Sequence, residues 1–194
     1  MRILYLYCHP VPESYHGALR AVALAGLARA GHEVDLCDLY AEGFDPVLGV
    51  AELRAYHDLA VNRRGVESYV DRLRRAEGMI VQFPTWCYGA PAMLKGFFDR
   101  LFLPGVAFDL ADPARVRPLL HNIGRLSAVV TYGRPRLFAW YMGDPPRKLV
   151  TRYIRWFIAP SAPVRYHALY RLNTAPDPAR VAFLEHVGLQ MERY

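Results

Sequence analysis

Residues 79–100 read MIVQFPTWCYGAPAMLKGFFDR, and the rest of the chain is arranged around this stretch. Residues 79–83 form a short apolar run after Gly78, as is typical of a strand that is covered on both faces. A helix is expected to begin at Pro91, because the first helical turn tolerates proline and apolar side chains then recur at helical spacing. Residues 84–90 form a loop at the carboxyl end of the strand, where open α/β sheets bind ligands.

The remaining sequence alternates strand and helix patterns on both sides of this stretch. Further strands are expected at 3–8, 33–38, 126–131 and 164–172. Further helices are expected after a cap at Ser14, at 51–60, at 66–76, after a cap at Asp144, and at 178–193. Residues 103–124 contain three prolines and two glycines, so an irregular connection is expected there. Together these patterns predict an α/β fold with one doubly wound parallel sheet in the order 2-1-3-4-5.

Length and composition indicate one globular domain over residues 1–194. A chain of 194 residues can bury a core, and 22% charged residues is ordinary for such a domain. No apolar run approaches the roughly 20 residues of a membrane span, and residues 1–8 are too short for a signal peptide. We therefore expect a cytoplasmic protein without membrane insertion.

The three cysteines are far apart in the sequence and form no CxxC pair. This spacing argues against a disulfide framework and against a metal site. Cys8 and Cys37 are expected to be small buried side chains, whereas Cys87 falls in the ligand loop.

The net charge of +6 is concentrated in one part of the chain. Residues 115–171 hold eleven Lys and Arg residues and a single acid, Asp144. Such a block attracts phosphates, of a nucleotide or of nucleic acid, but a solvated basic face is the more frequent explanation. Because no nucleic-acid motif accompanies the charges, no nucleic-acid partner is predicted.

Three loops are expected to meet at the carboxyl edge of the sheet, namely 9–16, 84–90 and 131–136. The sequence contains neither the dinucleotide fingerprint G-x-G-x-x-G nor a P-loop. A phosphate can bind at the start of the helix after Ser14, where N–H groups and the helix dipole favour an anion. Trp86 and Tyr88 suit either a flat ring or packing against another surface, and the residues alone favour neither.

The loop motifs resemble those of the flavodoxin-like NAD(P)H:quinone oxidoreductase family, NAD(P)H dehydrogenases (quinone). The first loop has His9-Pro10-x-Pro12-x-Ser14-Tyr15, and the last has Thr131-Tyr132-Gly133. The middle match is the specific one, FPTWxYGxPAMLKGFFDR over residues 83–100. The order and spacing of the three motifs extend over nearly the whole chain. The resemblance implies a flavodoxin-like fold.

The resemblance also implies a function, a cofactor and a set of binding residues. Family members are flavin enzymes, and the loop pattern favours FAD, with FMN as the alternative. NAD(P)H is the co-substrate, a quinone or similar acceptor is reduced in a ping-pong cycle, and the enzyme is a homodimer with the flavin at the interface. The implied cofactor-binding residues are His9, Ser14, Tyr15 and His16 around the phosphate, Pro84, Thr85, Trp86, Cys87 and Tyr88 at one edge of the ring, and Thr131, Tyr132 and Gly133 at the other.

Some positions differ from the family pattern. Many relatives have an aromatic residue in place of Cys87, and some have a second glycine in place of Arg134. Because residues 132–166 contain no histidine, no catalytic acid–base pair is assigned. Arg134 and Arg136 follow the last loop and are candidates for binding the phosphate of NADPH.

Two other functions are compatible with a flavin-binding fold. A flavodoxin-type electron carrier is one, although such carriers are usually acidic and dock on basic partners, and this chain carries +6. A regulatory subunit of a membrane transporter is the other.

Overall fold

The computed structural model describes residues 1–112 and 114–194. Its main sheet has five parallel strands in the order β2-β1-β3-β6-β7. The strands are β1 (Arg2–Tyr7), β2 (Glu33–Asp38), β3 (Gly78–Pro84), β6 (Leu126–Thr131) and β7 (Val164–Leu169). Counted by sheet strands, this is the predicted order 2-1-3-4-5, so the fold prediction is confirmed. β3 and β6 are buried along their whole length, as their continuous apolar runs require.

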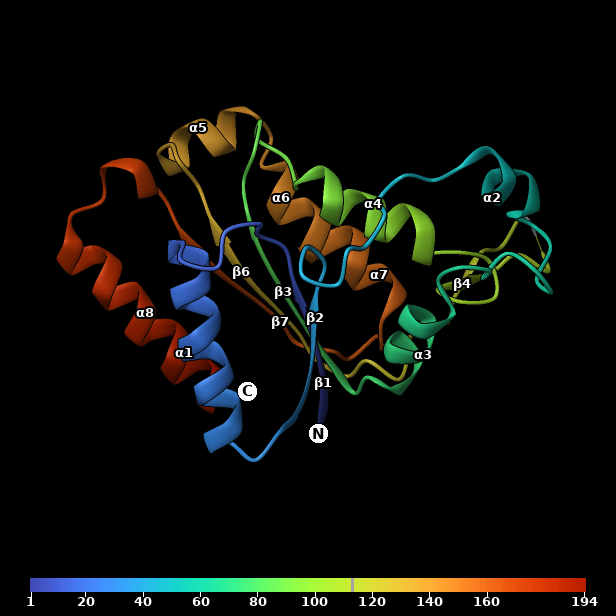
Figure 1. Cartoon of the computed structure of the whole chain (residues 1–194), viewed down its shortest axis with the longest axis horizontal. Coiled ribbons are helices and arrows are strands. Elements are labelled where there is room, and N and C mark those ends of the chain that lie inside the picture. The colour runs from blue at the N-terminus through green and yellow to red at the C-terminus, as the bar shows by residue number, and fades with distance from the viewer. Residues whose placement is uncertain (113) are drawn as a thin grey trace.

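Helices cover both faces of the sheet (Figure 1). α1 (Tyr15–Arg29) and α8 (Asp177–Glu192) lie together on one face, and α4 (Ala92–Leu101) lies on the other with α3 (Glu67–Arg75). Each face has its own buried apolar cluster, one around Leu19, Leu27 and Val187 and the other around Phe83, Phe97 and Leu101. The strand alternation therefore divides the core into two halves, with consecutive strand residues on opposite sides.

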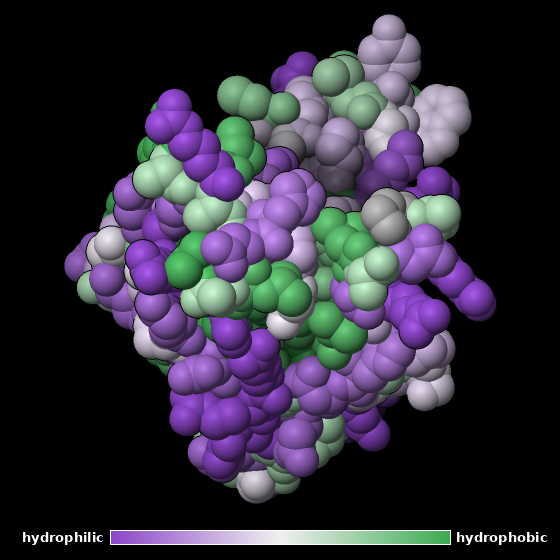
Figure 2. All heavy atoms as spheres, turned by 90° about the vertical axis from the view of Figure 1, so that its right-hand side faces the viewer, coloured by the Kyte–Doolittle hydropathy of each residue, from purple (hydrophilic) through white to green (hydrophobic). Residues whose placement is uncertain are grey.

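The remaining elements are short. They are α2 (Val50–Ala55), β4 (Phe108–Asp109), β5 (Arg117–Pro118), α5 (Arg136–Tyr141), α6 (Pro145–Lys148), the π-helix η1 (Leu149–Ile154), α7 (Arg155–Phe157) and the 3₁₀ turn η2 (Leu172–Thr174). β4 and β5 form a small antiparallel pair. On the side where α2 and β4 lie, the surface is mainly hydrophilic around a small apolar patch (Figure 2).

Two small residues bring α1 and α8 into close contact. A methyl group added to Gly26 would lie 2.5 Å from the carbonyl oxygen of Gly188. Gly188 therefore belongs to the α1–α8 contact, although in the sequence it looks only like a weak point of the helix. The start of α1 is as predicted, because the Ser14 side chain accepts a hydrogen bond from the Gly17 N–H.

The structure corrects the prediction for the segment after β6. Asp144 has φ 47° and makes no side-chain cap bond, so it is not the conventional cap that was expected. Its carboxylate instead accepts a hydrogen bond from Tyr132 and pairs with Arg147. The helix that follows changes after one turn into the π-helix η1. α5 was not predicted at all, because its six residues are too few to show a helical period.

Candidate functional site

A cavity of about 380 Å³ lies at the carboxyl edge of the sheet, where the loops after β1, β3 and β6 meet. This volume is within the range of small-molecule sites. Nine of the twelve residues predicted from the sequence line it: His9, Ser14, Tyr15, His16, Pro84, Thr85, Trp86, Thr131 and Gly133. The structure therefore brings three distant stretches of sequence together around one hollow.

Three predicted residues do not line the cavity. Cys87 is exposed and Tyr88 is half-buried, both at the tip of the loop after β3. Tyr132 follows Thr131 directly, and its side chain belongs to the other core cluster. Since consecutive residues point to opposite faces, Thr131 and Tyr132 cannot both face one cavity on one side of the sheet.

The loop after β3 ends in a tight two-residue turn. Trp86 and Gly89 exchange both backbone hydrogen bonds, at 3.1 and 2.8 Å. Between them Cys87 and Tyr88 have φ of 48° and 57°, the left-handed backbone of a type I′ turn, which neither side chain favours. Such strain is frequent at functional loops. Among the described residues, the N–H groups of Cys87 and Tyr88 have no hydrogen-bond partner, whereas those of Thr85 and Trp86 are bonded within the protein.

The first loop is held in a fixed shape by His9 and Ser14. Val11 donates its N–H to His9 Nδ1 at 3.1 Å, so the neutral ring carries its proton on Nε2. Burial lowers the pKa of His9, which favours this neutral form. A methyl group on Gly17 would lie 1.8 Å from the carbonyl oxygen of Pro12, so only glycine fits there. The loop thus presents an imidazole N–H donor without a mobile backbone.

A chain of buried hydrogen bonds supports the cavity from below. The hydroxyl of Tyr5 donates to Gln82 Oε1, and Gln82 Nε2 donates to His16 Nδ1 at 3.2 Å and to the His16 carbonyl at 2.7 Å. Since Nδ1 is an acceptor, Nε2 carries the proton and donates to Thr131 Oγ1 at 2.8 Å. Burial lowers the pKa of His16 to about 3, so the ring is neutral at pH 7.

This chain determines what the Thr131 hydroxyl can do. Its oxygen accepts from His16, and its own hydrogen has no acceptor among the described side chains. Thr131 lines the cavity, so its hydroxyl is available as a donor to a ligand. His16, by contrast, has both ring nitrogens engaged, which leaves it no nitrogen for a phosphate.

A second polar cluster lies on the opposite face of the sheet, beyond β6. The hydroxyl of Tyr132 donates to Asp144 Oδ1 at 2.7 Å and accepts from the hydroxyl of Tyr166 at 2.5 Å. Burial raises the pKa of both phenols. Arg147 pairs with Asp144 at 3.3 Å and lies over the Tyr166 ring, 4.4 Å from its centroid. The cluster fixes the start of α6 against β6.

Two lining residues were missed in the sequence, Leu172 and Asn173 of η2. A methyl group on Gly133 would lie 3.0 Å from Asn173 Nδ2, so the loops after β6 and β7 are in close contact. The available signal was the position of Asn173 just past the end of a predicted strand, because all parallel strands end at the same edge.

The donors of the cavity suit a flat ring with polar edges. Thr85 Oγ1 is buried and has no hydrogen-bond partner among the described residues, which is costly unless a ligand provides one. Thr131 adds a second hydroxyl, and the Asn173 amide lies beside Gly133. Trp86 is 42% exposed and lies 6.2 Å from the His9 ring, so an aromatic wall stands next to these donors. The residues present therefore fit the isoalloxazine of a flavin.

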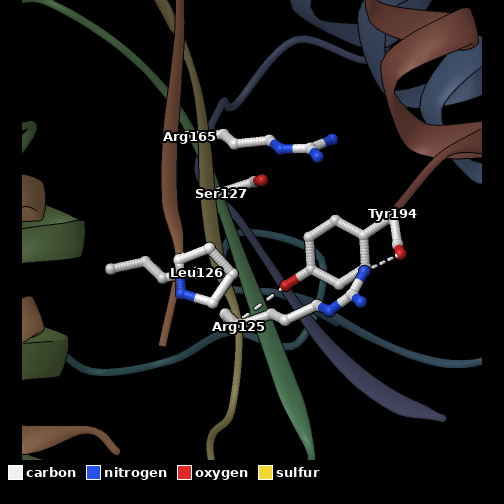
Figure 3. Close-up of a pocket in the computed structure, with 6 residues that line it drawn as sticks. Arg125, Leu126, Ser127, Arg165 and Tyr194 are labelled. Carbon is white, nitrogen blue, oxygen red and sulfur yellow. Dashed lines mark hydrogen bonds between the residues drawn. The ribbon is translucent and has the colours of Figure 1, made fainter. Parts of the chain in front are cut away.

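Another cavity, at the amino ends of β6 and β7, is too small for such a ring. It measures about 90 Å³ and lies between Arg125, Ser127, Arg165 and Tyr194 (Figure 3). The ring of Tyr194 closes it, with its hydroxyl donating to the backbone carbonyls of Met79 and Arg125. Compared with this small cavity, the carboxyl edge is favoured as the functional site by both its volume and its position.

Known proteins resemble this chain in sequence and in structure. A family model described as a flavodoxin-like fold matches residues 1–183. Ribosyldihydronicotinamide dehydrogenase (quinone) of Homo sapiens is 33% identical over 210 residues, which cover 99% of this chain and 85% of the human protein. FMN-dependent NADH:quinone oxidoreductase 1 of Bradyrhizobium diazoefficiens is 29% identical over 132 residues, 62% of this chain and 64% of that protein. The crystal structure of Smu.1420 from Streptococcus mutans UA159 covers 100% of both chains at 29% identity, with a TM-score of 0.86.

Proposed function

The chain belongs to the flavodoxin-like family that includes human ribosyldihydronicotinamide dehydrogenase (quinone), and from this premise we propose that the protein is a flavin-dependent NAD(P)H oxidoreductase of quinones or similar acceptors. One observation supports the proposal most directly. The cavity at the carboxyl edge combines an unpartnered buried hydroxyl, Thr85 Oγ1, with an aromatic wall, and a bound flavin would use both.

A bound flavin would supply the hydride chemistry between NAD(P)H and the acceptor, in the proposed ping-pong cycle. The chain itself holds and orients the ring. Thr85, Thr131 and the N–H groups of Cys87 and Tyr88 are donors, and fixed donors stabilise negative charge at the edge of a ring. Ser14 and the free Nε2–H of His9 lie at the start of α1, where a phosphate is favoured.

No side chain of the cavity is assigned as a catalytic acid or base. His16 is neutral and fully engaged, and Tyr132 is bonded on the other face. We therefore place the contribution of the protein in orientation and electrostatic stabilisation, and not in proton transfer by a side chain.

We propose FAD as the flavin, as the sequence motifs imply. FMN is the alternative, and it is the cofactor named for the Bradyrhizobium relative, an FMN-dependent NADH:quinone oxidoreductase. Mass analysis of the cofactor released by heat separates the two, because FAD carries an additional adenylate.

We also propose a homodimer. A groove of about 860 Å³ runs along η1 and α7, lined mainly by apolar side chains including Leu149, Tyr153, Trp156 and Phe157. Tyr141 of α5 and Trp156 of α7 are 78% and 47% exposed. A second copy would cover such a surface, which is unusual on a monomer. Analytical ultracentrifugation should give twice the chain mass of 22.1 kDa, and a monomer at micromolar concentration would contradict the proposal.

We place the protein in the cytoplasm. Its three thiols are unpaired, which is typical of a reducing compartment. Among the described residues, no helix has the length and apolar character needed to span a bilayer.

The absorbance spectrum before and after anaerobic NADPH tests the proposed function. Yellow protein whose flavin bands bleach, and recover when a quinone is added, is the expected result. Flavin bands that persist with both NADPH and NADH would point to an electron carrier or a regulatory subunit. Colourless protein that takes up neither FAD nor FMN would exclude flavin chemistry at this cavity.

A further inference from the structure

A second cavity of about 380 Å³ lies between α5 and the helix formed by α6 and η1. It is on the Tyr132 side of β6, where Asp144 bonds to Tyr132. Half of the residues that line it are cationic: Arg136, Trp140, Gly143, Asp144, Arg147, Lys148, Thr151 and Arg152. It shares no residue with the cavity beneath Thr131.

Three of the four cations here are uncompensated. Arg147 pairs with Asp144, the only acid of the lining. Arg136, Lys148 and Arg152 have no carboxylate within 4.0 Å among the described residues. Converging charges of one sign raise the local potential and favour a bound anion. Two guanidinium groups can also bind phosphate oxygens in bidentate fashion, a geometry that a solvated basic face does not need.

An aromatic side chain completes the lining. Trp140 is 73% exposed and lies in α5, four residues after Arg136. Residues four apart lie on one face of a helix, so the indole and the guanidinium face the same hollow. An exposed indole beside phosphate-binding cations is suited to stacking a nucleobase. Phosphate and base together indicate a nucleotide.

The position of the cavity links it to the proposed active site. Gly133 lines the first cavity and Arg136 lines the second, and only two residues separate them. Their Cα atoms are thus at most roughly 11 Å apart, a distance that an extended dinucleotide spans. One end of such a ligand can lie at the first cavity while the other reaches the cations.

We propose that this cavity binds the 2′-phosphoadenosine end of NADPH and selects NADPH over NADH. The inference rests on the proposed function, since it names the co-substrate of that site. It also revises the residues predicted from the sequence. Arg136 lines the cavity, whereas Arg134 lies over the Phe138 ring, 4.9 Å from its centroid, and is not part of the lining.

Calorimetric titration tests the binding site without turnover. The probe is adenosine 2′,5′-bisphosphate, and adenosine 5′-monophosphate and inorganic phosphate are the comparison ligands. The test variants are Arg136→Gln, which touches only this cavity, and the double variant with Arg152→Gln. Arg54→Gln is the matched control, because Arg54 is an exposed arginine of α2 outside every cavity described above.

The double variant should lose about tenfold or more in affinity for the bisphosphate, the usual scale for losing charge-assisted hydrogen bonds, and Arg54→Gln less than about twofold. The KM for NADPH should rise similarly, with the KM for NADH nearly unchanged. An equal effect on both co-substrates would overturn the proposal. So would wild-type protein that binds inorganic phosphate as tightly as the bisphosphate, because the nucleoside would then contribute nothing.

The two proposals fail in different ways. Protein without flavin, or without NADH oxidation, would contradict the proposed function, yet the bisphosphate titration would still give its own answer. If the wild type and both variants are flavin enzymes that oxidise NADH and NADPH equally well, the proposed function is retained. The proposal that the cationic cavity selects NADPH over NADH would then be rejected. Because Arg152 also lines the apolar groove, the sedimentation coefficient of the double variant should match that of wild type.

Discussion

Thr131 and Tyr132 are consecutive, yet they end in two very different environments. On the Thr131 side, neutral buried groups form a series of hydrogen bonds with defined donors and acceptors, from Tyr5 through Gln82 to His16. On the Tyr132 side, phenols, a carboxylate and arginines surround an open cationic cavity. The first environment is preorganised and insensitive to ions, whereas the second depends on charge and on the solvent.

The largest effect should come from breaking the neutral chain. Gln82→Leu removes the partners of the Tyr5 hydroxyl, of His16 Nδ1 and of the His16 carbonyl, all buried. Unsatisfied buried groups are costly, so urea unfolding should show a loss of about 3 kcal/mol. Arg136→Gln, on the charged side, should change the free energy of unfolding by less than about 0.5 kcal/mol. A similar loss of unfolding free energy in the two variants would show that the two sides of β6 contribute equally to stability.

Acidification should lower the stability of the protein through buried histidines on the Thr131 side of the sheet. Burial lowers the pKa of His16 to about 3 and that of His167 to about 4, both below the usual 6.5. A depressed histidine pKa means that the unfolded chain binds the proton first, so stability is full above pH 6.5 and falls as the pH drops towards the folded value. Between pH 8 and pH 5 each ring should cost about 2 kcal/mol.

Denaturant titrations at the two pH values test this expectation. His167→Asn should reduce the pH dependence by about half, because His16 still contributes. Besides burial, the neighbouring His186 and Arg165 lower the pKa of His167, whose Nδ1 lies 3.1 Å from His186 Nε2. A stability that rises between pH 8 and pH 5 would refute the neutral assignment of both rings.

A smaller effect concerns the donor at the edge of the cavity. Thr131→Val removes the hydroxyl that accepts from His16 and faces the cavity. Flavin affinity, measured by fluorescence quenching, should fall by about tenfold, the scale of one hydrogen bond to a polar ligand. Thr131→Ser retains the hydroxyl, so its flavin affinity should stay within about threefold of that of the wild type. If valine and serine bind flavin equally well, the hydroxyl is not a ligand donor.

The smallest effect should be that of salt on ligand binding. It should differ between the Thr131 side and the Tyr132 side of β6. Raising ionic strength from about 0.05 M to about 0.5 M shortens the screening length severalfold. The KM for NADPH should rise a few-fold, because exposed cations bind the phosphate. Flavin retention should change less, because the donors that face the ring are neutral and only the flavin phosphate is charged. If the KM for NADPH and the retention of flavin were equally sensitive to salt, the proposed difference between the two sides of β6 would be contradicted.

The sequence predicted elements that depend on local pattern. The apolar runs of β3 and β6 and the Ser14 cap all follow from residues near one another, and the structure has them. The convergence of His9, Thr85 and Thr131 follows from strand order alone.

What could not be predicted depends on partners far away in the chain. His16 looked like a phosphate ligand, and only the structure places Gln82 and Thr131 against its two nitrogens. Asp144 looked like a helix cap, and it is instead the acceptor for Tyr132. Asn173 carries no motif. His16 and Asp144 were recognised in the sequence as polar side chains with a local role, but their partners were set by the tertiary fold, and Asn173 was missed.

The π-helix η1 has a consequence for how such genes diverge. Six residues with i→i+5 bonding hold one residue more than the same stretch of α-helix would, and π-bulges are frequently found at functional sites. Loss of a single codon between 149 and 154 would remove that extra residue and restore the α-helix, while the residues on either side keep their orientation. Arg147 and Lys148 precede that point, while Trp156 and Phe157 follow it. Orthologues that are one residue shorter here are therefore expected to keep both the cationic cavity and the aromatic groove in place.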